Sequence, residues 1–122
     1  MAQTHPETAA TAELMRRFNE VFLRHDPRPL RDLIADDCVI EKISLDADGD
    51  RCIGRDACVA LWTAIATTPG THFDLEETYA MGDRAVIRWR FWSDDKTSVR
   101  GVNLMRVRDG QIVEAMGYTK GN

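Results

Sequence analysis

The spacing of apolar positions predicts helices in the first half of the chain and strands in the second half. Residues 4–27 are expected to form a helix, because their apolar residues recur at helical intervals along one stripe. The stripe consists of Leu14, Phe18 and Phe22. A short second helix is expected over residues 28–37, and a third over residues 54–70.

The rest of the chain has the period-two alternation and the turn residues of β-strands. The expected strands are residues 37–45, 71–81, 84–92, 97–108 and 111–119. Short turns join the last four, which predicts an antiparallel meander. Three helices that precede such a sheet should cover one of its faces, which is an α+β arrangement. Because no repeat or linker interrupts the pattern, we expect residues 1–122 to form a single domain.

Residues 84–92 show which sheet face is buried. One face carries only Ala85, Ile87, Trp89 and Phe91, whereas the other carries three arginines. Unpaired arginines are not expected in a core, so the apolar face should lie under the helices. The acidic residues of the preceding strand are expected to pair with these arginines on the outer face.

The last hairpin contains an isolated polar residue, Asn103, whose facing depends on the strand register. A two-residue loop at Asp109-Gly110 would place Asn103 opposite Met116 and put charges on both faces. A three-residue loop with a bulge at Gly110 would place Asn103 opposite Ala115 and leave one face free of charge. We therefore expect the bulged loop, with Asn103 among small residues on the helix-covered face. Such residues leave space for a pocket.

Composition narrows the possible partners. The 122 residues are 43% hydrophobic and 30% charged, with a net charge of −4. This balance gives no electrostatic basis for nucleic-acid binding, and no apolar run is long enough to span a membrane. Three cysteines lack the paired spacing of a zinc site and are expected to be reduced thiols in a cytoplasmic protein. Residues 46–50 lack the glycine and glutamate positions of a calcium loop, so no metal site is expected.

Four segments carry a resemblance to a known superfamily. They are "LIADDCVIE", "IGRDACVALW", "GDRAVIRWRF" and "MRVRDGQIVEAMGY". They resemble the nuclear transport factor two-like superfamily, which includes SnoaL-like polyketide cyclases and ketosteroid isomerase. The resemblance implies a cone-shaped, curved sheet that encloses an apolar pocket under the helices. It also implies a homodimer formed through the outer sheet face.

The resemblance also implies roles for individual residues. In the isomerases, a tyrosine and a protonated aspartic acid form an oxyanion hole, and another aspartate moves the proton. The corresponding positions here are Phe18, Asn103 and Lys42. An asparagine amide can still donate a hydrogen bond to a developing oxyanion. The acidic residue that SnoaL-like cyclases place late in the last strand corresponds to Gly117.

Glu41 and Lys42 are alternatives for the inward position on the first strand. The alternation groups Glu41 with apolar Val39 and Ile43, whereas the resemblance places Lys42 inside. A carboxyl group in an apolar pocket would have a raised pKa and could act as a general base. An inward lysine could bind an acid or attack a carbonyl. The sequence leaves this choice open.

Together, these patterns predict an acid–base enzyme of the isomerase, cyclase or hydratase type that needs no cofactor. Its substrate would be a small, largely apolar carbonyl or epoxide compound. Asn103 would stabilise the oxyanion, with Glu41 as the first candidate to move the proton and Lys42 as the second. The expected pocket residues are Phe18, Trp62, Ile87, Trp89, Met105, Ala115 and Gly117. The alternative is a ligand-binding or dimeric interaction module without catalysis.

Overall fold

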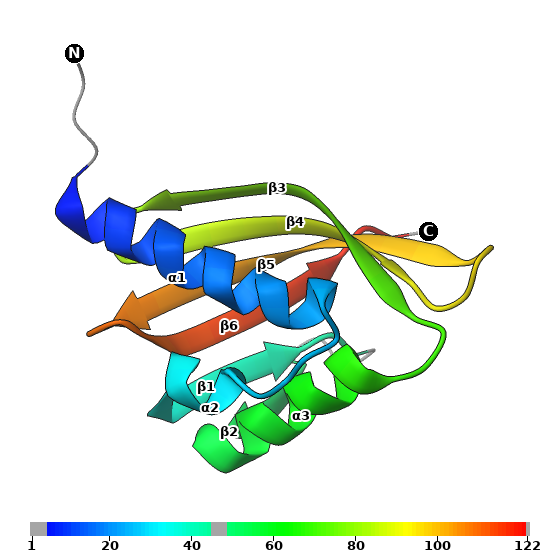
Figure 1. Ribbon diagram of the computed structural model, residues 1–122, viewed down its shortest axis with the longest axis horizontal. Helices are drawn as coiled ribbons and strands as arrows, with labels where there is room; N and C mark the ends of the chain where they lie inside the picture. Colours follow the sequence, from blue (N-terminus) through cyan, green and yellow to red (C-terminus); the bar gives the residue numbers. More distant parts are fainter. Residues whose placement is uncertain (1–4, 45–48, 122) are drawn as a thin grey trace.

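A curved six-stranded sheet with helices on one face forms the body of the protein (Figure 1). The computed structural model describes residues 5–44 and 49–121. The helices are α1 (Pro6–Leu23), α2 (Leu30–Leu33) and α3 (Arg55–Thr67). The strands are β1 (Ile34–Lys42), β2 (Asp50–Ile53), β3 (His72–Met81), β4 (Arg84–Trp92), β5 (Ser98–Arg108) and β6 (Gln111–Thr119). The predicted α+β class is confirmed.

The strand order is β2-β1-β6-β5-β4-β3, and every neighbouring pair is antiparallel except β1 with β6. The sheet is therefore mixed. The sequence pattern missed β2, which has only four residues. It also began β1 three residues late, because Ile34 extends the strand where a helix was expected. Two of the aspartates considered for a calcium loop, Asp46 and Asp48, lie outside the described residues.

The inner face of the sheet packs against α1 and α3. The predicted stripe of α1 is buried, with Leu14, Phe18 and Phe22 at most 9% exposed. On β4, Ala85 and Ile87 are buried under α1, as the alternation predicted. Burial of these apolar faces is the main source of stability that the fold provides.

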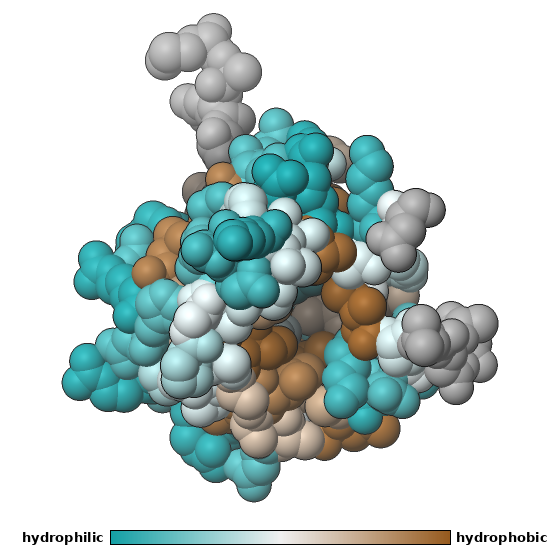
Figure 2. All heavy atoms as spheres, turned by 90° about the vertical axis from the view of Figure 1, so that its right-hand side faces the viewer, coloured by the Kyte–Doolittle hydropathy of each residue, from teal (hydrophilic) through white to brown (hydrophobic). Residues whose placement is uncertain are grey.

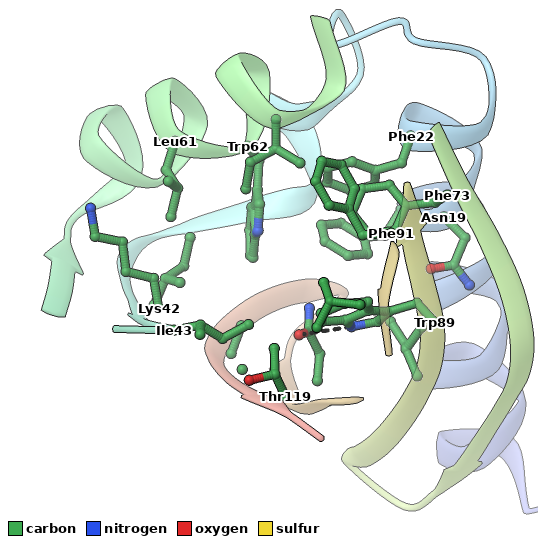
Figure 3. A pocket seen from close by; sticks show the side chains of 18 of the residues that line it. Asn19, Phe22, Lys42, Ile43, Leu61, Trp62, Phe73, Trp89, Phe91 and Thr119 are labelled. Atoms are coloured by element: carbon green, nitrogen blue, oxygen red, sulfur yellow. Dashed lines mark hydrogen bonds between the residues drawn. The ribbon is translucent and has the colours of Figure 1, made fainter. Parts of the chain in front are cut away.

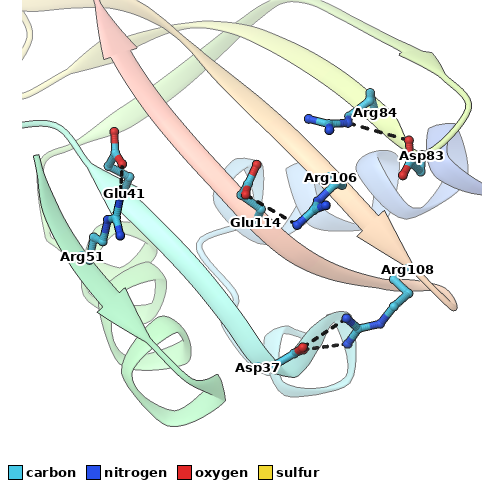
Figure 4. A network of polar contacts seen from close by, with 8 residues as sticks. All are labelled: Asp37, Glu41, Arg51, Asp83, Arg84, Arg106, Arg108 and Glu114. Carbon is cyan, nitrogen blue, oxygen red and sulfur yellow. Dashed lines mark hydrogen bonds and ion pairs between the residues drawn. The ribbon is translucent and has the colours of Figure 1, made fainter. Parts of the chain in front are cut away.

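The outer face of the sheet carries ion pairs between neighbouring strands. Arg88 lies 3.8 Å from Glu77 of β3, and Arg106 lies 3.6 Å from Glu114 of β6. Figure 4 shows the second of these pairs among others on this face. The predicted pairing is thus confirmed for Arg88, whereas Glu76 of β3 pairs with Arg100 of β5 and not with an arginine of β4. Each exposed pair contributes at most about 1 kcal/mol to the free energy of unfolding.

The β5–β6 hairpin corrects the predicted register. Its turn is a two-residue loop, with positive φ at both Asp109 and Gly110, and not the expected three-residue loop. The bulge lies further along β6, where Val113 is inserted between the pairs Val107–Ile112 and Arg106–Glu114. This single extra residue restores the facing that the bulged loop would have given.

As a result, Asn103 lies opposite Gly117 and not opposite Ala115, but its side chain is on the helix-covered face as expected.

No helix among the described residues is long and apolar enough to cross a membrane.

Candidate functional site

A cavity of about 360 Å³ lies between the helices and the inner face of the sheet. Figure 2 shows its opening as a hollow bordered by hydrophobic side chains, at the end of the molecule that lies to the right in Figure 1. Six aromatic residues from α1, α3, β3 and β4 contribute to its wall: Phe18, Phe22, Trp62, Phe73, Trp89 and Phe91. The size and the apolar wall are typical of sites for small organic ligands.

The aromatic rings support one another across the helices and the sheet. Phe18 packs edge-on against Trp62 at a centroid distance of 4.7 Å and against Phe22 at 5.0 Å. Phe22 contacts Phe73 in the same way, and Phe73 contacts Trp89. These edge-to-face contacts connect α3 to β4 through α1 and β3, and each is worth about 1 kcal/mol beyond burial. The wall is therefore preformed.

A hydrogen bond fixes the orientation of the Asn103 side chain in the cavity. The Trp89 indole Nε1 donates a hydrogen bond of 3.2 Å to the Asn103 Oδ1, drawn as a dashed line in Figure 3. Because an indole nitrogen can only donate, this contact settles which end of the amide is oxygen. The Nδ2 group of Asn103 has no acceptor among the described residues, so it is available to a ligand.

Two glycines make room for this arrangement. A Cβ at Gly101 would lie 2.5 Å from the Trp89 ring and 2.5 Å from the Tyr118 carbonyl oxygen. The indole can therefore lie against β5 only because residue 101 has no side chain. A Cβ at Gly117 would lie 3.4 Å from the Asn103 Oδ1. The same Cβ would lie 3.2 Å from the Ile43 Cγ1, so Gly117 leaves room for the Ile43 side chain beside the Asn103 amide.

Asn19 is a second amide on the cavity wall, and the sequence pattern missed it. It is 7% exposed, and its Nδ2 donates to the Thr78 hydroxyl at 3.1 Å. Figure 3 places its side chain between α1 and the strands, and its Oδ1 has no donor among the described residues. The sequence does indicate that Asn19 faces inward, because Met15, Asn19 and Phe22 are spaced i, i+4 and i+7 on one helix face.

Glu41 and Lys42 lie on different faces of β1. The buried residues at the centre of the strand are Cys38 and Ile40, so Lys42 shares the inner face with them. Glu41 borders the cavity, but its carboxylate is paired with Arg51 of β2 at 3.5 Å on the outer face (Figure 4). The inward Glu41 favoured by alternation is therefore wrong. The alternation misled because outward Val39 and exposed Ile43 are both apolar.

Lys42 lies at the rim of the cavity. In Figure 3 its side chain extends outward on the α3 side of the cavity, with the ammonium on the side away from Trp89. The side chain is exposed and forms no ion pair with any described residue.

Most of the predicted wall residues line the cavity. Phe18, Trp62, Ile87, Trp89, Ala115 and Gly117 all do so. Met105 does not, although it is only 2% exposed. Its neighbours on the adjacent strands are Ala85 and Ala115, and its long side chain fills the space that these small residues leave.

The thiols are separate from this site. Cys38 and Cys58 are buried and Cys52 is partly buried, and all three are free. Burial raises the pKa of the Cys38 and Cys58 thiols, which keeps them in the unreactive protonated form. No group of histidine, cysteine or acidic side chains in the described parts of the chain is arranged to hold a metal ion.

The family follows from comparison with known proteins. A family model described as the SnoaL-like domain matches residues 15–115. The chain belongs to this family. The SnoaL-like domain is also 63% identical to a crystal structure of an NTF2-like protein of unknown function from Mesorhizobium loti, with a TM-score of 0.94 and 98% of each chain covered. The predicted membership of the nuclear transport factor two-like superfamily is confirmed.

More distant structures share the fold of the SnoaL-like domain. A putative SnoaL-like polyketide cyclase from Jannaschia sp. CCS1 is 17% identical, with a TM-score of 0.79 and coverage of 98% of this chain and 92% of that one. A putative ketosteroid isomerase from Kribbella flavida is 18% identical, with a TM-score of 0.79 and coverage of 95% and 82%. No curated protein matches the chain.

Proposed function

We propose that the cavity binds a small, largely apolar carbonyl compound and that Asn103 donates a hydrogen bond to its carbonyl oxygen. The observation that carries this proposal is the Trp89–Asn103 contact, which turns the amide donor of Asn103 away from the indole. The aromatic side chains of the wall would contact the apolar part of the ligand. A fixed donor in an apolar cavity polarises a carbonyl more effectively than water does, because it needs no reorientation.

The wall chemistry supports a carbonyl compound over an epoxide. Opening an epoxide with an Asp-Arg-Asp set would require aspartate and arginine side chains around the substrate. Among the described residues that line the cavity there is neither an aspartate nor an arginine. Glu41 is the one carboxylate that borders it, and Arg51 pairs with that group.

Binding can be tested with two ligands that differ only in the carbonyl group. Tryptophan fluorescence is titrated with 2-acetylnaphthalene and with 2-ethylnaphthalene, using the wild type and Asn103→Leu. We expect the wild type to bind the ketone about tenfold more tightly than the hydrocarbon, the effect of one hydrogen bond. Asn103→Leu should remove this difference. Gln111→Leu is the matched control, since it deletes a side-chain amide at the hairpin turn, away from the cavity.

A ketone preference that persists in Asn103→Leu would refute the assigned role of Asn103. Failure of both ligands to bind the wild type would refute the proposed cavity function.

A second candidate function is acid–base catalysis of the isomerase, cyclase or hydratase type without a cofactor. It is supported by the position of Lys42, the ionisable side chain on the inner face of β1 at the cavity rim. In this role the flexible side chain of Lys42, in its neutral form, would fold inward from the rim and take a proton from the carbon next to the carbonyl, while Asn103 stabilises the enolate oxygen.

Exchange of the methyl protons of 2-acetylnaphthalene in D₂O, followed by NMR, tests this step. Exchange should exceed the buffer rate with the wild type and return to it with Lys42→Met. Exchange at the buffer rate with the wild type would exclude this catalysis and leave the binding function intact. The homodimer and the cytoplasmic location stay predictions.

A further inference from the structure

Three residues on neighbouring strands form a row across the floor of the cavity. Gly117 of β6 is the register partner of Asn103 of β5. Met116 is the partner of Glu41 in the parallel β1–β6 pair, so Gly117 lies next to Lys42. Because adjacent strands are about 4.8 Å apart, the Lys42 and Asn103 Cα atoms are separated by about 10 Å. Gly117 has no side chain, and the Ile43 side chain lies over it, so the surface between Lys42 and Asn103 is apolar.

The two ends of this row differ in charge and in exposure. The Asn103 amide is a neutral donor inside the cavity, held by Trp89. Lys42 is an exposed cation at the rim, with its ammonium directed outward (Figure 3). One ligand can therefore meet both groups only if it extends from the cavity floor to the rim.

The carboxylates near Lys42 that the structure describes form no ion pair with it. Glu41 is paired with Arg51 on the outer face. Asp50 is the direct partner of Lys42 in the β1–β2 pair, yet no ion pair forms between them. The other exposed side chains of the wall are uncharged: Ile43, Leu75, Val99 and Thr119. Lys42 is thus the uncompensated charge among the described residues that line the cavity.

We infer that the ligand is an apolar keto acid, with a carboxylate at the rim against Lys42 and a ketone at the floor against Asn103. This inference rests on the proposed carbonyl-binding function and narrows its ligand class. A singly charged carboxylate matches the site better than a phosphate, because the wall residues that the structure describes include one cation and no arginine. The flexible stem of lysine allows its ammonium to follow a carboxylate at the opening.

Two matched probes test the inference: 6-acetyl-2-naphthoic acid and the neutral 2-acetylnaphthalene. Their dissociation constants are measured by tryptophan fluorescence for the wild type, Lys42→Met and Lys42→Arg. We expect the wild type to prefer the acid about fivefold, the upper range for an exposed ion pair. The ratio of the two constants should fall to about one in Lys42→Met and be retained in Lys42→Arg. Salt at 0.5 M should weaken the preference by screening.

Lys96→Met is the control variant, because Lys96 lies in the turn between β4 and β5 and does not line the cavity. It should keep the wild-type ratio. A wild type that binds the ketone but shows no preference for the acid would overturn this inference alone. A preference that Lys42→Met leaves unchanged would also overturn it. If neither probe binds, the proposed function fails together with the inference.

Discussion

Replacing Gly101 with alanine should destabilise the fold and disturb the Asn103 donor together. The new Cβ would lie 2.5 Å from the Trp89 ring and 2.5 Å from the Tyr118 carbonyl oxygen. Both neighbours are hard to move, since one is a buried aromatic ring and the other is backbone of β6. Overpacking of this kind costs about 1–3 kcal/mol, so we expect about 2 kcal/mol of lost unfolding free energy. For a domain of this size, that corresponds to a fall in Tm of roughly 6–10 °C.

Urea and thermal unfolding of the wild type, Gly101→Ala and Gly121→Ala would measure this effect. Gly121 is a matched control, because a Cβ there would meet no atom within 4 Å. Ketone binding should weaken in Gly101→Ala under conditions in which the protein remains folded, since the displaced indole no longer orients the Asn103 amide. A Gly101→Ala protein as stable as the wild type, with the same ketone affinity, would refute the argument from close packing.

Three further predictions concern regions outside the cavity. Arg28 holds the pKa of Asp26 at about 2, so the stabilising contribution of Asp26 is present above its unfolded pKa near 3.8 and is lost as the pH falls towards 2. Urea unfolding of Asp26→Asn should show a smaller loss of stability over this range than the wild type shows. Leu104 is exposed on the outer face, so if that face forms a homodimer, Leu104→Lys should give a monomer in light scattering, whereas a monomeric wild type would contradict the dimer. Iodoacetamide should label Cys52 in the native protein well before Cys38, and equal labelling measured by mass spectrometry would contradict the burial of Cys38.

The sequence alone predicted the layers of the fold and the facing of Asn103, because both depend on repeated patterns. The apolar spacing is regular over several strands and helices, so a single residue that breaks the pattern does not change the predicted layers. The arginines of β4 determined the inner face through the cost of burying charge, and burial confirms that choice. Asn103 then followed by alternation across the β5–β6 pair.

Features that depend on a single residue could not be predicted in this way. A bulge at Gly110 and a bulge at Val113 both place the Asn103 side chain on the helix-covered face. The distribution of charges between the two faces therefore could not show which of these residues forms the bulge. The inner face of β1 was ambiguous because apolar residues occur on both sides of the strand. Met105 was misplaced since alternation gives the facing of a side chain but not the volume around it.

The inserted residue Val113 has a consequence for the cavity itself. If Val113 paired with Arg106 and formed no bulge, the register of the two-residue turn would continue along the whole hairpin, and Asn103 would lie opposite Met116 in place of Gly117. A methionine side chain would then stand in the gap between Asn103 and Lys42. The shape of the cavity therefore depends on the position of one bulge as well as on side-chain size. Deleting Val113 would remove the bulge and still leave Gly117 opposite Asn103, whereas a shift of the register by one residue would bring Met116 there.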